Sequence, residues 1–292
     1  MRLLLLSVFA IAACAQPVLG QPTSAPLRLA TWNLEHLAEY NGSGCRPRTD
    51  ADYAAMRAYV DLVDADIIAF QEVENEAAAE RVFDPAKYEI VIERRVGSGR
   101  RTECRGMPGQ FMNRQATGFA VRRGITFQRH ADFTDLQAGG PDLRSAVDIT
   151  LQPPGGEPIR LLSIHLKSGC FEGTSRGDCP RLFRQIPILE RWIDARARAE
   201  ERFAVMGDFN RWLGVSGDPV WAEWDDADPP NADLTLVSGD EGATCDRRYP
   251  HFIDNVVVDR LTAPAISGFH EWTHVGPMLS DHCLVSVEIA PS

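Results

Sequence analysis

The 292-residue sequence lacks several features that would place it quickly in a structural class. It contains no internal repeat and no low-complexity segment, which argues against a solenoid or a disordered chain. It has no C-x2-C pair, so its cysteines do not indicate a zinc site. No apolar run after the first residues is long enough to span a bilayer. Positive charge is also scarce. The formal net charge of −11 disfavours a tight, sequence-reading DNA binder, because such a surface does not attract polyanions unaided.

The remaining composition is that of a large globular domain. Hydrophobic residues make up 44% of the chain and charged residues 24%, which is enough for a sizeable core. No second domain boundary is visible, so we expect one domain over residues 27–292.

The first twenty residues are typical of a secretory signal peptide. Arg2 gives a short positive region, and the apolar stretch after it is too short to cross a membrane. Two cleavage sites compete, one before Gln16 and one before Cys14, which would leave Cys14 as a lipid anchor. Residues 21–26 are expected to form a linker. The protein is therefore expected to be exported, as a secreted, periplasmic or membrane-anchored lipoprotein.

Cysteine usage agrees with export. Without Cys14, six cysteines remain, and an even number in an exported chain suggests three disulfides. Cys170 and Cys179 enclose a short loop and are predicted to form a local bridge. The best remaining pairing is Cys45–Cys104 with Cys245–Cys283.

Short apolar runs alternate with helical patterns along the chain, which predicts a layered α/β sandwich. Helices are expected at residues 49–64 and 180–202, and a loop rich in Trp, Asp and Pro is expected up to residue 231. Strands are expected at 27–34, 66–70, 88–93, 117–122, 146–151, 160–166, 203–206, 253–258 and 283–289.

Polar side chains recur at the ends of these apolar runs, where scaffolds commonly display functional groups. Hydrolysis of a phosphodiester needs a cation on the phosphoryl oxygens, an activated water and help for the leaving oxygen. Carboxylates can hold a hard cation, and a histidine oriented by an aspartate can take a proton from water. The candidates are Asn33, Glu35, Gln71, Glu72, His165, Lys167, Asp208, Asn210, Asp254, Asp281 and His282.

These residues lie in the segments TWNLEHL, IIAFQEVEN, LLSIHLKSGC, VMGDFNRW, FIDNVVV and LSDHCLV. In this order they resemble the endonuclease/exonuclease/phosphatase superfamily, in particular its secreted deoxyribonuclease-like branch, over nearly the whole chain after Leu27. The resemblance implies an α/β fold, a four-layer α/β sandwich with two central mixed β-sheets. It also implies an exported, divalent-metal-dependent phosphodiesterase, with an endonuclease as the first expectation. The alternative is a sphingomyelinase-like lipid phosphodiesterase or a phosphatase. A catalytically dead binding module is disfavoured because every motif residue is intact.

The resemblance also implies roles for individual residues. His282 is expected to be the general base or to face the phosphate, and Asp254 is expected to orient it. Asp208 and Asn210 are expected to position the water and stabilise the transition state. His165 is similar to a second histidine that supports the leaving group.

The implied metal ligands are Glu72, as the principal carboxylate, and Asp281 beside it, for Mg²⁺ or alternatively Mn²⁺ or Ca²⁺. Asn33, Arg144 and Lys167 are the expected substrate-binding residues, with solvated surface as the alternative for Lys167. Nucleic acid is the expected substrate. No stable protein partner is indicated, and a monomer is expected.

Several readings stay open on the sequence alone. Glu35 is either a second metal-side carboxylate or a salt-bridge partner. The tryptophans at 212, 221 and 224 fit core or loop packing, with stacking of one of them on a base as the alternative. The basic run 94–105 is either a solvated loop or a phosphate contact. Residues 113–115 include no acid that could partner His165.

Overall fold

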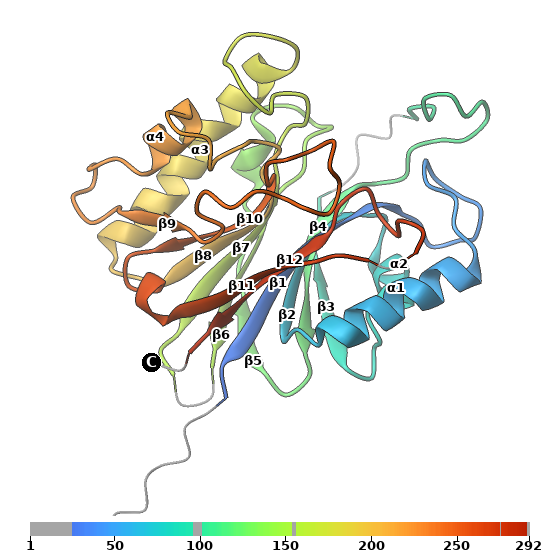
Figure 1. Ribbon diagram of the computed structural model, residues 1–292, viewed down its shortest axis with the longest axis horizontal. Helices are drawn as coiled ribbons and strands as arrows, with labels where there is room; N and C mark the ends of the chain where they lie inside the picture. Colours follow the sequence, from blue (N-terminus) through green and yellow to red (C-terminus); the bar gives the residue numbers. More distant parts are fainter. Residues whose placement is uncertain (1–24, 96–100, 154–155, 275, 291–292) are drawn as a thin grey trace, which may run out of the picture.

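The computed structural model describes residues 25–95, 101–153, 156–274 and 276–290. The expected signal peptide, most of the expected linker and the candidate lipid anchor Cys14 lie outside these residues. The described chain forms two mixed six-stranded sheets packed face to face (Figure 1). Among the described residues, no helix combines the length and the apolar character needed to cross a bilayer.

Each half of the sandwich pairs one sheet with its own helices. The first sheet has the order β11 (Ile266–Trp272), β12 (Leu284–Ile289), β1 (Leu27–Leu37), β2 (Ile67–Val73), β4 (Ala116–Arg122) and β3 (Tyr88–Ile92). The second has the order β5 (Thr126–Arg129), β6 (Val147–Gln152), β7 (Ile159–His165), β8 (Phe203–Asp208), β10 (Asp254–Asp259) and β9 (Leu234–Leu236). The helices are α1 (Asp50–Val63), α2 (Glu76–Val82), α3 (Cys179–Arg198) and α4 (Pro219–Trp224), with short 3-10 turns at Thr134–Gln137 and Ala263–Ala265.

Three hydrophobic cores separate the layers. One lies between the sheets and joins residues such as Ile67 and Val256. A second packs α1 and α2 on the outer face of the first sheet, and a third packs α3 and α4 on the outer face of the second. The order helices, sheet, sheet, helices is the four-layer α/β sandwich that the sequence predicted.

The residues that predicted the first helix also determine its two ends and its buried face in the structure. Thr49 caps α1 in a capping box with Asp52, which satisfies backbone donors that a helix start leaves free. Asp64 ends the helix in a left-handed conformation. The buried residues Tyr53, Met56 and Val60 recur at helical spacing and face the first sheet.

All strands predicted from the sequence are present, with ends that differ by a few residues. The prediction of an unbroken loop up to residue 231 is wrong, because α4 lies within it. Asp218 caps α4 by accepting from the backbone of Val220 and Trp221, and Pro219 fits the first helical turn. The elements α2, β5, β9 and β11 are additional, and most are too short for periodicity to reveal.

All three predicted disulfides are present, Cys45–Cys104, Cys170–Cys179 and Cys245–Cys283. Three bridges are consistent with an exported protein, since cytosolic proteins rarely keep them.

One carboxyl on α3 makes stability depend on pH. Burial, followed by the charge of Asp194 one turn away, raises the pKa of Glu190 to about 8. The folded state therefore binds this proton more tightly than the unfolded chain, whose glutamate pKa is 4.5. The proton's contribution to the free energy of unfolding is fully present below pH 4.5 and is lost as the pH rises through 8.

Glu190→Gln is therefore expected to be near neutral at pH 5 and stabilising at pH 8.5. The side chain is half-exposed, so we expect a gain on the order of 1 kcal/mol after solvent screening. Urea unfolding at both pH values measures it, with Glu89→Gln at an exposed site on β3 as the control. A Glu190→Gln difference that does not change with pH would show that the carboxyl is not held protonated.

Candidate active site

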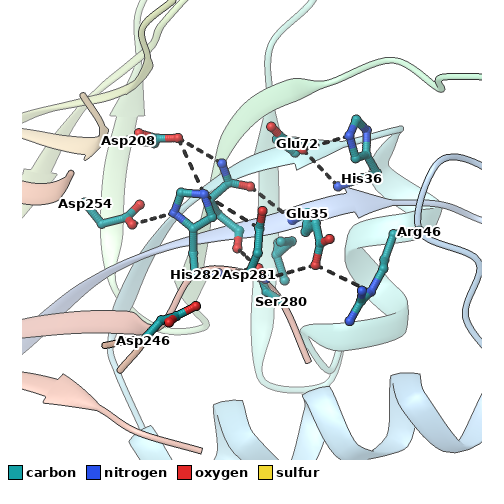
Figure 2. Close-up of polar contacts among 12 residues, drawn as sticks. Glu35, His36, Arg46, Glu72, Asp208, Asp246, Asp254, Ser280, Asp281 and His282 are labelled. Carbon is teal, nitrogen blue, oxygen red and sulfur yellow. Dashed lines mark hydrogen bonds and ion pairs between the residues drawn. The ribbon is translucent and has the colours of Figure 1, made fainter. Parts of the chain in front are cut away.

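The polar residues predicted from the sequence meet at one edge of the sandwich because of strand direction and register. Parallel β1 and β2 end together there, as do parallel β7 and β8. Antiparallel β10 begins there, with Asp254 opposite Asp208, and His165 also lies opposite Asp208. His282 precedes β12, which is antiparallel to β1. Both sheets therefore contribute side chains to one site (Figure 2).

Asp254 and His282 form the pair expected from the sequence. The Asp254 carboxylate lies 2.6 Å from Nδ1 of His282, so Nε2 is the ring nitrogen directed toward Asp208, 3.9 Å away. Burial alone lowers the pKa of His282, but the charges of Asp254, Asp208 and Asp281 outweigh it and hold that pKa well above its usual value. Figure 2 shows the imidazole between Asp254 and Asp208. The imidazole is thus oriented and able to hold a proton.

Asp208 lies at the centre of the site and is 1% exposed. It accepts hydrogen bonds from Nδ2 of Asn33 (3.0 Å) and from the backbone N–H of Asn210 (2.8 Å). Burial raises the pKa of Asp208 to about 7, and the charge of Asp254 acts in the same direction. A carboxyl in this state is suited to take up either a proton or a cation.

Backbone geometry before and after Asp208 explains the Gly-Asp-x-Asn sequence. Gly207 has a φ of +146°, and a Cβ there would collide with the Ile164 carbonyl of β7. Asn210 adopts a left-handed φ of 51°, and its Nδ2 donates to the Leu166 carbonyl at 3.2 Å. Asn210 is thereby fixed next to Asp208.

His165 is buried next to two carboxylates. Its Nε2 lies 3.4 Å from Asp208 and 3.8 Å from Glu72. Burial, then the positive charge of Arg144, keeps the pKa of His165 well below its usual value, so the ring is neutral. Nδ1 has no hydrogen-bond partner among the described residues. The candidates at 113–115 point elsewhere, with Asn113 bonded to Glu74.

Glu72 faces two histidines. Its Oε1 is near His165, and its Oε2 accepts the backbone N–H of His36 at 3.0 Å and lies 3.7 Å from Nε2 of His36. Glu72 has a left-handed φ of 62°, which turns it out of β2 toward the site. The sequence analysis did not single out His36, although it lies inside the TWNLEHL segment.

Glu35 is a salt-bridge partner in this structure. Its Oε2 lies 3.4 Å from Nε of Arg46 and accepts the backbone N–H of Asp281 at 2.9 Å. Burial, followed by the charge of Asp281, raises the pKa of Glu35. This contact links the end of β1 to the segment that carries His282.

Arg48 strengthens the same link and was not predicted. Its buried guanidinium donates to the carbonyls of Leu34 (2.8 Å), Glu35 (2.9 Å) and Leu279 (3.0 Å). Nothing in the local sequence around Arg48 distinguishes it from a surface arginine, because its partners come from two distant segments.

The donor chemistry of the site fits a divalent cation. Asp208, Asp254 and His282 each offer one ligand atom within 4.8 Å of the others. Glu72 faces the same space from the first sheet, and Asp281 lies at its exposed rim, 3.7 Å from Nε2 of His282. Several carboxylates crowded around one space repel each other, and a bound cation would relieve that repulsion.

Of the two basic residues predicted to bind substrate, Arg144 lies beside the site and Lys167 does not. Arg144 is buried beside the site, where it donates to the Leu166 carbonyl at 3.3 Å and its charge acts on His165. Lys167 is instead held by Asp178 at 2.8 Å and by the Ser168 carbonyl at 2.7 Å. It does not line the pocket around Asp208 and His282.

The basic run 94–105 is partly neutralised. Arg95 pairs with the buried Glu93 at 3.1 Å, and Arg114 lies 3.8 Å from the same carboxylate. Arg101 and Arg105 are exposed, with Arg101 over the ring of Phe111. Residues 96–100 lie outside the described residues.

Fold and site together define a class, the α/β-sandwich hydrolases in which two sheets contribute carboxylates, an Asp–His pair and a second histidine to one pocket of about 380 Å³. The chain belongs to the Endonuclease/Exonuclease/phosphatase family, whose model matches residues 30–282. Members of this family are divalent-metal-dependent hydrolases that act on phosphodiester bonds.

Solved structures of other proteins share the fold at low sequence identity. The human Nocturnin catalytic domain with bound sulfate is 15% identical at a TM-score of 0.61, covering 91% of this chain and 95% of its own. Truncated Caenorhabditis elegans TDP2 is 16% identical at a TM-score of 0.58, and the match covers 91% of this chain and 98% of TDP2. The AP endonuclease LMAP from Leishmania major is 15% identical at a TM-score of 0.59, and the match covers 98% of this chain and 93% of LMAP. A search of curated proteins finds no match.

Proposed function

We propose that the protein is an exported, divalent-metal-dependent phosphodiesterase that cleaves nucleic acid. The observation that carries the proposal is the Asp254–His282 pair, whose free ring nitrogen faces the buried Asp208 across the junction of the two sheets. This arrangement supports the activation of water next to a phosphorus atom.

In the proposed mechanism, the neutral form of His282 takes a proton from the attacking water through Nε2. Asp254 fixes the ring through Nδ1 and stabilises the imidazolium that forms. Asp208 and Asn210 hold the water and the phosphoryl group in position, since both are locked by hydrogen bonds and need no reorganisation. The water then attacks phosphorus while the bond to the leaving oxygen breaks. The leaving oxygen takes up a proton from solvent, and His282 returns its own proton to solvent.

His165 and Asn33 act on the phosphoryl group and the leaving oxygen. With its lowered pKa, His165 is a neutral hydrogen-bond donor and not a strong acid. The positive charge of the nearby Arg144 favours the developing negative charge. Leaving-group assistance is therefore expected to be modest.

Glu72 would hold the cation as its principal ligand, with Asp281 contributing from the rim. A bound cation supplies Lewis-acid stabilisation of the phosphoryl oxygens. Oxygen donors favour Mg²⁺, with Mn²⁺ or Ca²⁺ as alternatives.

Export is proposed from the signal-like first twenty residues together with the three disulfides. Lipidation at Cys14 would set the location and not the substrate.

Nucleic acid is preferred to lipid because the tryptophan-rich loop is not available for insertion into a membrane. Trp224 is fully buried, and its indole N–H donates to the Ile186 carbonyl at 3.2 Å. Trp221 packs against the core under α3. The exposed Arg101 and Arg105 provide positive charge for a polyanion.

A direct comparison of substrates tests the proposal. The purified protein is incubated with plasmid DNA, RNA, sphingomyelin vesicles and a phosphomonoester, each with Mg²⁺ or with chelator. We expect Mg²⁺-dependent nicking of DNA that weakens as salt rises. Sphingomyelin hydrolysis without cleavage of DNA or RNA at low salt would replace the proposal with the lipid alternative.

A further inference from the structure

The pocket of the active site extends past the carboxylates to a group of aromatic side chains. Phe171, Trp212 and His251, here called the aromatic shelf, line the same pocket as Asp208 and His282. The rings of Phe171 and Trp212 are nearly parallel, at 18° with centroids 6.0 Å apart. His251 lies 5.0 Å from Trp212. Phe171 and Trp212 are half-buried and His251 is exposed, so these rings are not a sealed core.

Chain connectivity places the shelf close to the reacting groups. Trp212 follows Asn210 by two residues, and His251 precedes Asp254 by three. Two or three extended residues span at most about 7–11 Å. Figure 2 shows Asp246, which lines the same pocket, on the side of His282 away from Glu72 and His36. The shelf therefore lies in the same pocket as the residues proposed to hold the phosphate.

The shelf is held in place before any ligand binds. The backbone N–H of Trp212 donates to the Phe171 carbonyl at 3.1 Å. Arg211 is buried and donates to the carbonyls of Cys170 (3.2 Å) and Gly173 (2.7 Å), on both sides of Phe171. The bridge between Cys170 and Cys179 closes the same loop. Binding to such a preformed surface loses little conformational entropy.

The other side of the shelf is fixed by a second bridge. Cys245–Cys283 ties the segment before His251 to the residue that follows His282. At the rim of the pocket, Arg248 lies over the ring of Tyr249 at 5.6 Å and is paired with Asp246. A cation therefore already covers this aromatic ring.

We propose that the aromatic shelf stacks the base of a nucleotide next to the scissile phosphate. This proposal rests on the proposed function and adds the substrate contact that positions the diester over Asp208. Flat half-exposed rings suit any base, since every base has a π-face. The enzyme is thus expected to require a base on one side of the bond that it cleaves, with little preference among bases.

The test uses an end-labelled single-stranded DNA 12-mer and the same strand with one tetrahydrofuran residue, which keeps the backbone but lacks the base. Initial rates at each linkage are measured with Mg²⁺ at low strand concentration. In the wild type, cleavage of one linkage next to the tetrahydrofuran residue is expected to fall roughly 5–150-fold, the range of stacking on one base. Linkages farther away serve as internal controls.

Variants assign the effect to the shelf. In Trp212→Ala the ratio between the two strands is expected to approach one, whereas Trp212→Phe keeps most of it and shows that the site is still folded. Trp221→Ala, on α4 and outside the pocket, is the matched control and should keep the ratio of the wild type.

Each outcome is informative. Equal cleavage of both strands by the wild type would overturn the shelf proposal, and so would a ratio that survives in Trp212→Ala. Absence of cleavage at every linkage would instead refute the proposed nuclease function. Loss of phosphocholine-diester hydrolysis in Trp212→Ala, with no DNA cleavage by any variant, would identify a quaternary ammonium as the occupant and overturn both.

Discussion

Replacing His282 by alanine is expected to lower kcat for DNA nicking by roughly 10²–10⁴-fold, the usual contribution of a general base. The imidazole of His282 is bonded to Asp254 through Nδ1 and directs its other ring nitrogen, Nε2, toward Asp208. Without it, the attacking water loses the base that Asp254 holds in a fixed orientation. The fold should survive, because His282 precedes β12 and its side chain is in none of the three hydrophobic cores.

The measurement is the initial rate of plasmid nicking with saturating Mg²⁺, together with circular dichroism of each variant. His270→Ala is the matched control, since His270 is an exposed histidine on β11 and does not line the pocket. Near wild-type turnover in a folded His282→Ala variant would remove His282 from the mechanism.

Removal of divalent metal is expected to abolish activity, and Mg²⁺ or Mn²⁺ should restore it. Glu72→Gln is expected to weaken metal binding by at least about tenfold, because an amide replaces the charge of the principal carboxylate. Titration calorimetry of the folded protein with Mn²⁺ measures this loss independently of turnover.

Glu76→Gln is the matched control for Glu72, because Glu76 is an exposed glutamate at the start of α2. Its metal affinity should equal that of the wild type. Full activity in excess chelator, or unchanged Mn²⁺ affinity in Glu72→Gln, would contradict the metal mechanism.

Much of this site could be predicted because its residues sit next to strongly apolar strands. Asp208 ends β8 and Asp254 begins β10, so the local pattern marks both positions, and strand register then brings them together. Three disulfides were also predictable from export and even cysteine number, and the Cys170–Cys179 bridge from one short loop, whereas the other two pairings were a best guess that the structure bears out. Such features depend on local sequence and simple counting.

Other parts of the site depend on contacts between distant segments. Arg48 acts through carbonyls near residues 34 and 279, and the aromatic shelf combines loops around residues 171, 212 and 251. No periodicity connects those positions. Lys167 follows His165 by two residues, but its ammonium is bound by Asp178, an interaction that sequence spacing does not reveal.

The sequence also does not reveal which arginines of the basic run 94–105 are neutralised by ion pairs. Five arginines within residues 94–105 suggest a phosphate-binding loop, yet Arg95 is paired with Glu93, which is buried. A formal charge count treats paired and free guanidinium groups alike. Among the described residues of this run, Arg94, Arg101 and Arg105 are the exposed arginines that could meet a polyanion.

Because the two sheets share the site, the thickness of the hydrophobic core between them sets the distances between the polar groups of the site. The hydrogen bonds from Asn33 to Asp208 and between Asp254 and His282 both cross from one sheet to the other. Facing sheets pack about 10 Å apart, a spacing set by the side chains between them. Met206 and Val256 are buried between the sheets. Replacing them with larger or smaller side chains would therefore change the distances between the polar groups that the two sheets contribute to the site, without altering any of those groups.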